Sequence, residues 1–230
     1  EFVVEPQEGI PFARNACIKA SYDADDDAFI FVDDDEFAPD NWLQNMLNAW
    51  EKHKTDVITG PVIGKFSGPN IPKWAIKSEI FNKYRSKIDG VKLKVAFTNN
   101  TLISKNVIKT IGPAFDSRFR YTGGSDFNYF LKVKNAGYDI TWSIDTVIYE
   151  DVPEYRMKIS WVAKRAFRSG AGTSICFAMN NNTINTKIKC ILLAFYNINK
   201  GIIKLFASIF FSRHTNFVQG IRQLSVGIGR

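Results

Sequence analysis

Four consecutive acidic residues give the clearest chemical signal in the sequence. Asp33, Asp34, Asp35 and Glu36 directly follow the apolar segment Ala28–Val32. An apolar run of that length predicts a buried strand, and α/β sheets bind their ligands at the carboxyl ends of such strands. Carboxylates two residues apart can meet one ion, and their hard oxygens suit Mg²⁺ or Mn²⁺ bridging a diphosphate. We therefore predict Asp33 and Asp34 at a diphosphate and Asp33 and Asp35 on the metal, with a solvated acidic turn as the alternative.

Two arginines in the C-terminal part are candidates for binding the same anion. Arg165 and Arg168 are three residues apart in a predicted helix, so they share one face. They could stabilise a diphosphate through charge-assisted hydrogen bonds, although such pairs also occur as ordinary surface charge. Other metal chemistry is disfavoured, because the chain has only three cysteines and two histidines and no CxxC motif. A zinc site and a disulfide framework are therefore not expected.

The elements that must position these groups alternate between strands and helices, which predicts an α/β sheet. Apolar spacing predicts strands over residues 28–32, 56–62, 95–103, 140–142 and 146–149. It predicts helices over residues 12–21, 42–50, 78–85, 105–111, 125–136 and 161–167. Asp40 and Ser104 are the expected N-caps of two of these helices. The glycines at 170 and 172 are expected to end one helix, and Lys200-Gly201 is expected to break the apolar helical segment 188–211.

The charge is distributed unevenly along the chain. Residues 155–230 contain 12 Lys or Arg and no Asp or Glu, whereas residues 1–154 contain 18 basic and all 23 acidic residues. Such asymmetry points to an anionic partner for the C-terminal part. Its basic residues are mixed with long aliphatic runs, which favours an anionic membrane surface over nucleic acid. The longest charge-free run, Cys190–Asn199, is short of the roughly 20 residues of a spanning helix, and packing on the domain core is the alternative.

Three blocks in the same order resemble the family 2 glycosyltransferases of GT-A fold. The first block comprises Glu5-Pro6, GIPFARN at 9–15 and AFIFVDDDEFAPDNWL at 28–43. The second comprises TNNTLI at 98–103, Gly112, Phe115-Asp116, GGSD at 123–126 and AGY at 136–138. The third, EDVP at 150–153 with RAFRSG at 165–170, is similar to bacterial exopolysaccharide glucosyltransferases of the succinoglycan type.

The resemblance implies roles for further residues. It implies that Asp126 is the catalytic base, in a motif where Ser125 replaces the usual Glu. It places Arg14 and Asn15 near the nucleotide diphosphate. Asn100 and Trp142 are expected at the acceptor site, although a buried Trp is more often part of the core. Glu150 is implied as a further metal ligand, at a position where many relatives have His.

The resemblance also implies a fold and an activity. We expect a GT-A-like mixed sheet flanked by helices over residues 1–155, and a helical, membrane-associating extension over 156–230. The expected activity is metal-dependent, inverting transfer from a nucleotide-sugar, with UDP as the expected nucleotide, to a glycan or lipid-linked saccharide in bacterial exopolysaccharide assembly. A cytoplasmic protein peripheral to the inner face of the plasma membrane would suit that task. The nucleobase-binding part of the family is expected to precede residue 1. The alternatives are a nucleotidyltransferase and a non-catalytic, carbohydrate- or membrane-binding remnant of a transferase.

Overall fold

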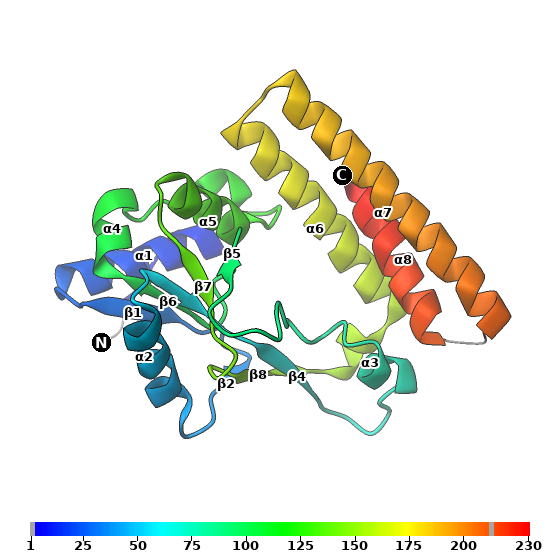
Figure 1. Cartoon of the computed structure of the whole chain (residues 1–230), viewed down its shortest axis with the longest axis horizontal. Helices are drawn as coiled ribbons and strands as arrows, with labels where there is room; N and C mark the ends of the chain where they lie inside the picture. The colour runs from blue at the N-terminus through cyan, green and yellow to red at the C-terminus, as the bar shows by residue number, and fades with distance from the viewer. Residues whose placement is uncertain (1–2, 212–213) are drawn as a thin grey trace. The chain divides into compact units, whose positions relative to one another are not determined.

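The chain forms two compact units in the computed structural model, which describes residues 3–211 and 214–230 (Figure 1). The first unit comprises Glu1–Gly64, Asn82–Tyr121 and Ser125–Glu150. The second comprises Lys65–Phe81, Thr122–Gly124 and Asp151–Arg230. The largest segment of the second unit starts at Asp151, and the unit also takes in two shorter segments from the N-terminal part. The boundary expected at residue 155 stays a prediction.

A five-stranded mixed sheet forms the centre of the first unit. Its order is β1 (Ala28–Phe31), β6 (Thr101–Ser104), β3 (Val57–Thr59), β7 (Ile140–Trp142) and β5 (Lys92–Leu93). Strands β3 and β7 pair in parallel, and the other neighbours pair antiparallel. The predicted mixed α/β sheet flanked by helices is confirmed.

Alternation along the strands explains why both faces of this sheet are covered. Val57 and Ile103 point to one face, and their neighbours Ile58 and Leu102 point to the other. The first face packs against α1 (Ile10–Asp23), α4 (Lys105–Ile111) and α5 (Ser125–Asn135). The second face packs against α2 (Trp42–His53). Strand β1 is therefore packed between two apolar layers. The acidic residues begin two positions after its last residue.

A second, three-stranded sheet has the order β2 (Glu36–Phe37), β8 (Ile148–Val152) and β4 (Val62–Phe66). Strand β2 pairs antiparallel with β8, in a register that sets Glu36 opposite Glu150. This pairing brings two carboxylates 114 residues apart in sequence to the same place, directly after the acidic turn.

Two local predictions in the first half of the chain are wrong. The expected helix over residues 78–85 is absent, and a helix occurs earlier, at α3 (Lys73–Lys77). The reason is a β-bridge between Val62 and Lys83, whose backbone N–H and C=O groups bond to each other and hold residue 83 in extended form. The N-cap of α2 is Asn41 rather than Asp40, and its side chain makes no capping hydrogen bond.

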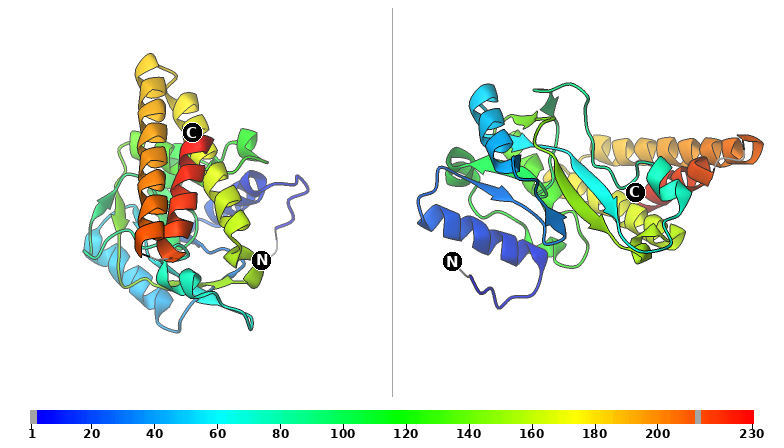
Figure 2. Two further views of the ribbon diagram at one scale, coloured as in Figure 1. Left: turned by 90° about the vertical axis from the view of Figure 1, so that its right-hand side faces the viewer. Right: turned by 90° about the horizontal axis from the view of Figure 1, so that it is seen from below.

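Three long helices dominate the second unit: α6 (Ile159–Asn180), α7 (Ile184–Phe211) and α8 (His214–Gly229). The left panel of Figure 2 shows them side by side, with α8 packed against both of the others. The helix breaks predicted at Gly170–Gly172 and at Lys200-Gly201 are wrong, because α6 and α7 run through them. The glycines instead allow close packing: a Cβ at Gly170 would lie 2.2 Å from the carbonyl oxygen of Val226.

Helix α7 is also longer and more apolar than its charge-free run suggested. Its residues Ile184–Ile209 have a mean hydropathy of 1.4 in their most apolar window, which is long and apolar enough to cross a membrane by composition alone. Only 6% of that window is buried within the protein. The apolar side of α7 is therefore not explained by packing.

Candidate active site

The acidic residues after β1 form a tight turn closed by two hydrogen bonds. The Asp33 backbone N–H donates to Oε2 of Glu36 at 2.9 Å, and the Glu36 N–H donates to the carbonyl oxygen of Asp33 at 3.1 Å. Asp34 lies exposed between them. Burial raises the pKa of the Asp33 carboxyl, and the charge of Asp35 raises it further. The turn therefore concentrates negative charge at the end of a strand, where the sequence predicted a metal and a diphosphate.

Glu36 has the most perturbed carboxyl group of this turn. Burial raises its pKa to about 7, and the charge of Asp33 acts in the same direction. Hydrogen bonds from the backbone of Asp33 and the amide of Asn99, together with the charge of Lys83, act against that shift. No role was predicted for Glu36 from the sequence, yet its side chain holds the turn closed.

Glu150 lies opposite Glu36 and is paired with a lysine that the sequence analysis missed. The Nζ atom of Lys83 lies 2.5 Å from Oε2 of Glu150, which is only 7% exposed. The positive charge of Lys83 also partly offsets the rise that burial causes in the pKa of Asp33. No local pattern could have identified Lys83, because it reaches the site through the long-range bridge to Val62.

Arg14 connects the acidic turn to the start of α5. Its Nη2 atom lies 3.9 Å from Oδ1 of Asp33, and its Nη1 atom donates to Oγ of Ser125 at 3.2 Å. Burial lowers the pKa of Arg14, while the charges of Asp126 and Asp33 act to raise it. Its guanidinium group also lies 5.5 Å from the ring centre of Phe115. One partly buried cation therefore interacts with both predicted chemical centres of the first unit.

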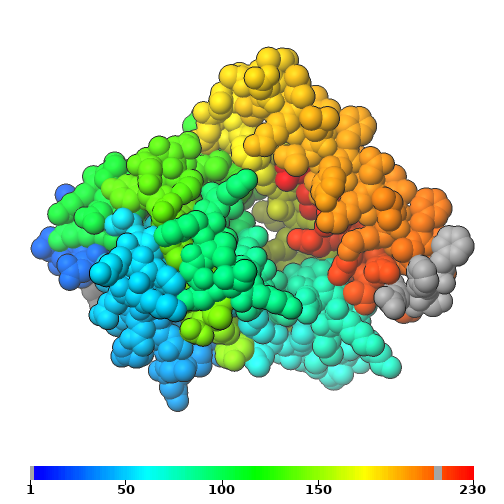
Figure 3. All heavy atoms as spheres, viewed as in Figure 1, coloured from blue at the N-terminus to red at the C-terminus, as the bar shows by residue number. Residues whose placement is uncertain are grey.

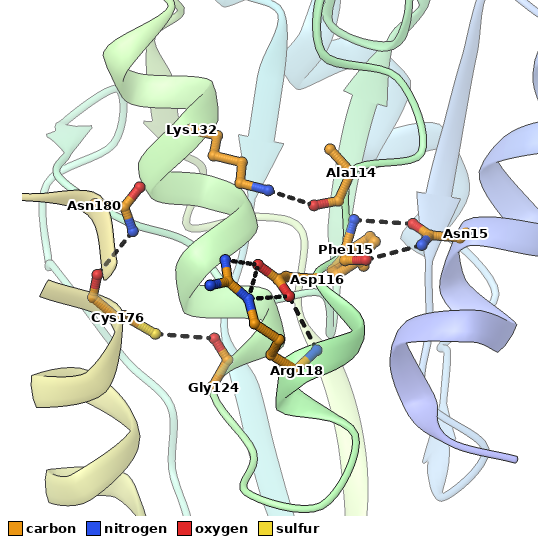
Figure 4. Close-up of polar contacts among 9 residues, drawn as sticks. All are labelled: Asn15, Ala114, Phe115, Asp116, Arg118, Gly124, Lys132, Cys176 and Asn180. Atoms are coloured by element: carbon orange, nitrogen blue, oxygen red, sulfur yellow. Dashed lines mark hydrogen bonds and ion pairs between the residues drawn. The ribbon is translucent and has the colours of Figure 1, made fainter. Parts of the chain in front are cut away.

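Asp126 lies in the first turn of α5, where the helix dipole favours an ionised carboxylate. Its Oδ1 atom accepts a hydrogen bond from the N–H of the next residue, Phe127, at 2.8 Å. The preceding Gly123 and Gly124 have φ angles of 75° and 98°, which L-residues with side chains rarely adopt. The carbonyl oxygen of Gly124 accepts a hydrogen bond from Sγ of Cys176 on α6 (Figure 4).

Asn15 and Asp116 make structural contacts near this site. The side-chain amide of Asn15 donates to the carbonyl oxygen of Phe115, and its oxygen accepts from the Phe115 N–H, both at 2.9 Å (Figure 4). Asp116 pairs with Arg118, whose Nη2 atom lies 2.6 Å from Oδ2. The predicted contact of Asn15 with a diphosphate stays a prediction, and its observed contacts fix the loop beneath Arg14.

The side-chain amide of Asn100 is hydrogen-bonded within the first unit. It is fully buried, its amide donates to the carbonyl oxygens of Pro61 and Thr146, and its Oδ1 accepts from Nε1 of Trp42. Every polar group of this side chain is therefore occupied internally, and its predicted role at the acceptor stays a prediction. Trp142 is 1% exposed and its Nε1 donates to Ser86, but it forms part of the wall of a small pocket. Its predicted role at the acceptor stays a prediction.

The pocket beside Trp142 is formed entirely by the first unit. Its lining includes Lys83 and Asn99, which contact Glu150 and Glu36, and also Arg85 and Phe97. The guanidinium group of Arg85 lies 4.8 Å from the ring centre of Phe97. The pocket therefore places an aromatic ring and polar groups next to the acidic turn.

Arg165 and Arg168 belong to the second unit. Both are exposed on α6, and the guanidinium group of Arg165 lies 5.2 Å from the ring centre of Trp161. Their predicted contact with a diphosphate stays a prediction. Within the first unit, Arg14 and Lys83 are the cations beside the acidic turn.

The fit of a divalent ion depends on the ligands available. Among residues 3–211 and 214–230, no group of three or more Asp, Glu, His or Cys side chains could hold a metal ion by itself. The carboxylates of Asp33 and Asp35 have the hard oxygens that Mg²⁺ and Mn²⁺ prefer, whereas Glu150 is paired with Lys83. The residues therefore fit an ion that takes its remaining oxygens from a bound diphosphate and water.

Comparison with known proteins supports the sequence resemblance. Residues 2–112 match the family model described as glycosyl transferase family 2. The chain is 30% identical over 165 residues to the succinoglycan biosynthesis protein ExoM of Rhizobium meliloti, covering 72% of this chain and 52% of that protein. It is 25% identical over 170 residues to the glycosyltransferase AglE of Haloferax volcanii, covering 74% of this chain and 52% of that protein.

The chain therefore spans about half the length of the curated relatives it matches. Among solved structures, TarS of S. aureus in complex with UDP aligns over 92% of this chain and 68% of its own, at 13% identity and a TM-score of 0.42. That similarity is too low to support an argument. Residues 2–112, which include β1 and the acidic turn, therefore match glycosyl transferase family 2, and the two sequence relatives support the same resemblance over 72% and 74% of this chain.

Proposed function

We propose that this protein transfers a sugar from a nucleotide-sugar, with UDP as the expected nucleotide, to an acceptor hydroxyl with inversion at the anomeric carbon. The observation that carries the proposal is the position of Arg14, between Asp33 of the acidic turn and the Ser125-Asp126 start of α5. A transferase needs a diphosphate site and a base beside each other. Arg14 marks such an arrangement within one compact unit.

Asp126 is the proposed general base. It would take the proton from the acceptor hydroxyl as that oxygen attacks the anomeric carbon and the bond to the diphosphate oxygen breaks. Proton removal of this kind contributes about 10²- to 10⁴-fold in rate. The start of α5 favours the ionised carboxylate, and Ser125 holds Arg14 beside it. The leaving nucleoside diphosphate carries the negative charge away from the sugar.

Asp33 and Asp35 are the proposed ligands of Mg²⁺ or Mn²⁺, with Asp34 beside the diphosphate. When bound, such an ion supplies a Lewis acid that stabilises the charge on the diphosphate oxygens. Arg14 lies next to Asp33, so this chain's own cation can neutralise the same phosphate group. Glu150 could join the ligand set only if its carboxylate were released from Lys83.

We further propose that the acceptor is a glycan or lipid-linked saccharide in bacterial exopolysaccharide assembly, as the name of the ExoM relative suggests. Such an acceptor would be met at the cytoplasmic face of the plasma membrane. The acid-free, basic segment 155–230 and the exposed apolar side of α7 support attachment to an anionic membrane surface.

A donor screen with Mg²⁺ or Mn²⁺ tests the transfer, and released nucleoside diphosphate is the product to measure. Changing Asp35→Ala should lower turnover about 10³-fold or more, because the bound ion stabilises the charge of the transition state by several kcal/mol. Asp40→Ala, on an exposed residue of the same segment, is the matched control. Full activity in excess chelator would contradict the metal assignment. Release of pyrophosphate would indicate a nucleotidyltransferase, and binding without turnover would indicate a non-catalytic remnant.

A further inference from the structure

Helix α7 carries a continuous exposed strip of large apolar side chains, here called the α7 stripe. Their exposed fractions range from 40% to 72%. The members of the stripe are Ile184, Ile188, Ile191, Leu192, Phe195, Tyr196, Ile202, Ile203, Phe206 and Ile209. They extend along the helix from its first residue to near its last, a length of about 40 Å at 1.5 Å per residue.

The stripe occupies one side of the helix. At about 100° per residue, its ten members fall within a sector of about 140°. The opposite side packs on α8, where Gly201 meets Gly220 and Leu224, and Gly227 meets Ala194 and Ile198. Figure 3 shows side chains of α7, in orange, at the surface. Among the described residues, α8 is the helix that packs extensively on α7. The stripe faces away from α8.

Charge distinguishes this surface from a protein interface. Lys187, Lys189 and Lys200 are exposed at the two edges of the stripe, and no acidic residue occurs anywhere from residue 155 to 230. Asn185 and Asn199 are exposed polar residues inside the sector, and the amide of Asn199 donates to the carbonyl oxygen of Phe195 at 2.9 Å. An apolar centre with lysines on both edges matches the hydrocarbon and phosphate layers of an anionic bilayer.

We propose that α7 lies in the plane of an anionic lipid surface, with its stripe in the outer hydrocarbon layer and its edge lysines at the lipid phosphates. This rests on the proposed membrane attachment and adds which residues insert and in what orientation. The in-plane orientation follows from comparison with the alternative, a helix that crosses the bilayer. If α7 crossed the bilayer, Lys189, Lys200 and Lys204 would lie within about 11 Å of its midpoint, inside a hydrocarbon core about 30 Å thick. In the plane, all three can reach the aqueous side.

Environment-sensitive probes on single cysteines test the orientation. Cys17→Ser and Cys190→Ser remove the accessible thiols, while Cys176 is fully buried and can stay. Matched neighbouring sites are Lys187→Cys with Ile188→Cys near one end, and Lys200→Cys with Ile203→Cys nearer the middle. With anionic vesicles, both stripe probes should brighten about threefold and shift to the blue, and both lysine-site probes should change little. Brightening at Lys200 and Ile203 alike, with little change near the end, would show a spanning helix and overturn the proposal.

A binding measurement separates this inference from the membrane attachment on which it rests. Ile203 and Ile88 are 67% and 68% exposed, so Ile203→Asp and Ile88→Asp form a matched pair on α7 and on the first unit. Ile203→Asp should weaken partition of the full chain into anionic vesicles about tenfold, and Ile88→Asp should leave it unchanged.

Each other outcome has a defined meaning. If the unchanged protein does not bind anionic vesicles, membrane attachment itself fails. If it binds and Ile203→Asp binds equally well, attachment stands and the stripe assignment is overturned. Sedimentation without vesicles provides the last check: an unchanged protein that dimerises and an Ile203→Asp protein that is monomeric would identify the stripe as a contact between two copies, which also overturns the proposal. Thermal melting of each variant confirms that it is folded.

Discussion

The two units of this chain use apolar and acidic residues in opposite ways. In the first unit, apolar side chains fill two buried layers on either side of the sheet, and carboxylates gather at the end of β1. In the second unit, acidic residues are absent after Glu154, and ten large apolar side chains of α7 remain exposed. Folding alone explains the buried layers of the first unit, because burial offsets the loss of chain entropy. The carboxylates at the end of β1 instead suit the proposed metal and diphosphate site. Burial does not explain the exposed apolar side chains of the second unit. They indicate a role in placing the protein at a surface rather than a role in catalysis.

The strongest test of the chemical role of the first unit is a pair of aspartates from the same sequence block. Asp126→Asn should lower turnover about a hundredfold or more, because an amide cannot accept the acceptor's proton. Stability and donor binding should remain, since Asn serves as well as Asp near a helix start. Asp116→Asn is the comparison, because Asp116 is paired with Arg118. Its loss should cost stability rather than catalysis.

Turnover with a soluble acceptor and thermal melting of both variants distinguish these roles. Full turnover by Asp126→Asn would show that this residue only stabilises the start of α5. Asp116 and Glu150 would then be the next carboxylates to examine. A large loss in both variants, with unchanged melting, would mean that the loop from Phe115 to Asp126 acts as one catalytic element.

The second test concerns the lysines at the edges of the α7 stripe. Replacing Lys187, Lys189 and Lys200 together by Gln should weaken binding to anionic vesicles by one to two orders of magnitude at low salt, because each lysine near such a surface is worth about 1 kcal/mol. The loss should shrink as salt is raised. Turnover in detergent with a soluble acceptor should be unchanged. A parallel loss of turnover would contradict the separation of chemistry from location.

The third test uses the raised pKa of Glu36. Its carboxyl has a pKa of about 7 in the folded protein and about 4.5 in the unfolded chain, so the folded state holds the proton more tightly. The contribution of this group is fully present below about pH 4.5 and is lost as the pH rises to about 7. The loss is at most about 3 kcal/mol, and solvent screening of this partly exposed group reduces it.

Glu36→Gln mimics the protonated form and should flatten the fall in unfolding free energy between pH 4.5 and 7. Denaturant unfolding in chelator measures this without a bound divalent ion. Glu51→Gln, on the exposed side of α2, should keep the original slope. An unchanged slope in Glu36→Gln would show that this carboxyl is ionised in the folded protein at lower pH than its burial implies.

The sequence predicted those features that depend on local order. The apolar run before Asp33 predicted β1, and apolar periodicity predicted α2, α4 and α5 within a few residues. Sequence-based prediction failed where a residue far away in the sequence determines the local structure. Lys83 is extended because it bridges to Val62. The pairing of Glu36 with Glu150 likewise depends on register between strands far apart in the chain.

Glycine gave the most instructive errors, and it supplies the test with the smallest expected effect. Gly170 and Gly172 were expected to end a helix, but both lie within α6 and each allows a close contact. A Cβ at Gly170 would lie 2.2 Å from the carbonyl oxygen of Val226 on α8. A Cβ at Gly172 would lie 3.3 Å from the carbonyl oxygen of Gly123, in the loop that leads to Asp126. Substitution of Gly170 therefore tests the stability of the fold. Substitution of Gly172 tests the positioning of the loop before Asp126.

Gly170→Ala should destabilise the fold by about 1–3 kcal/mol through overpacking, with turnover per folded molecule unchanged. Gly172→Ala meets a looser contact, so its loop needs to shift by only a few tenths of an ångström, and melting should change little. That shift would move the backbone at Gly123, three residues before the proposed base. A base displaced slightly from the acceptor hydroxyl should lower kcat about threefold and leave the KM for the donor unchanged. A change in donor KM without a change in kcat would instead mean that the loop contributes to donor binding, and the position of Asp126 would then not depend on the contact between Gly172 and Gly123.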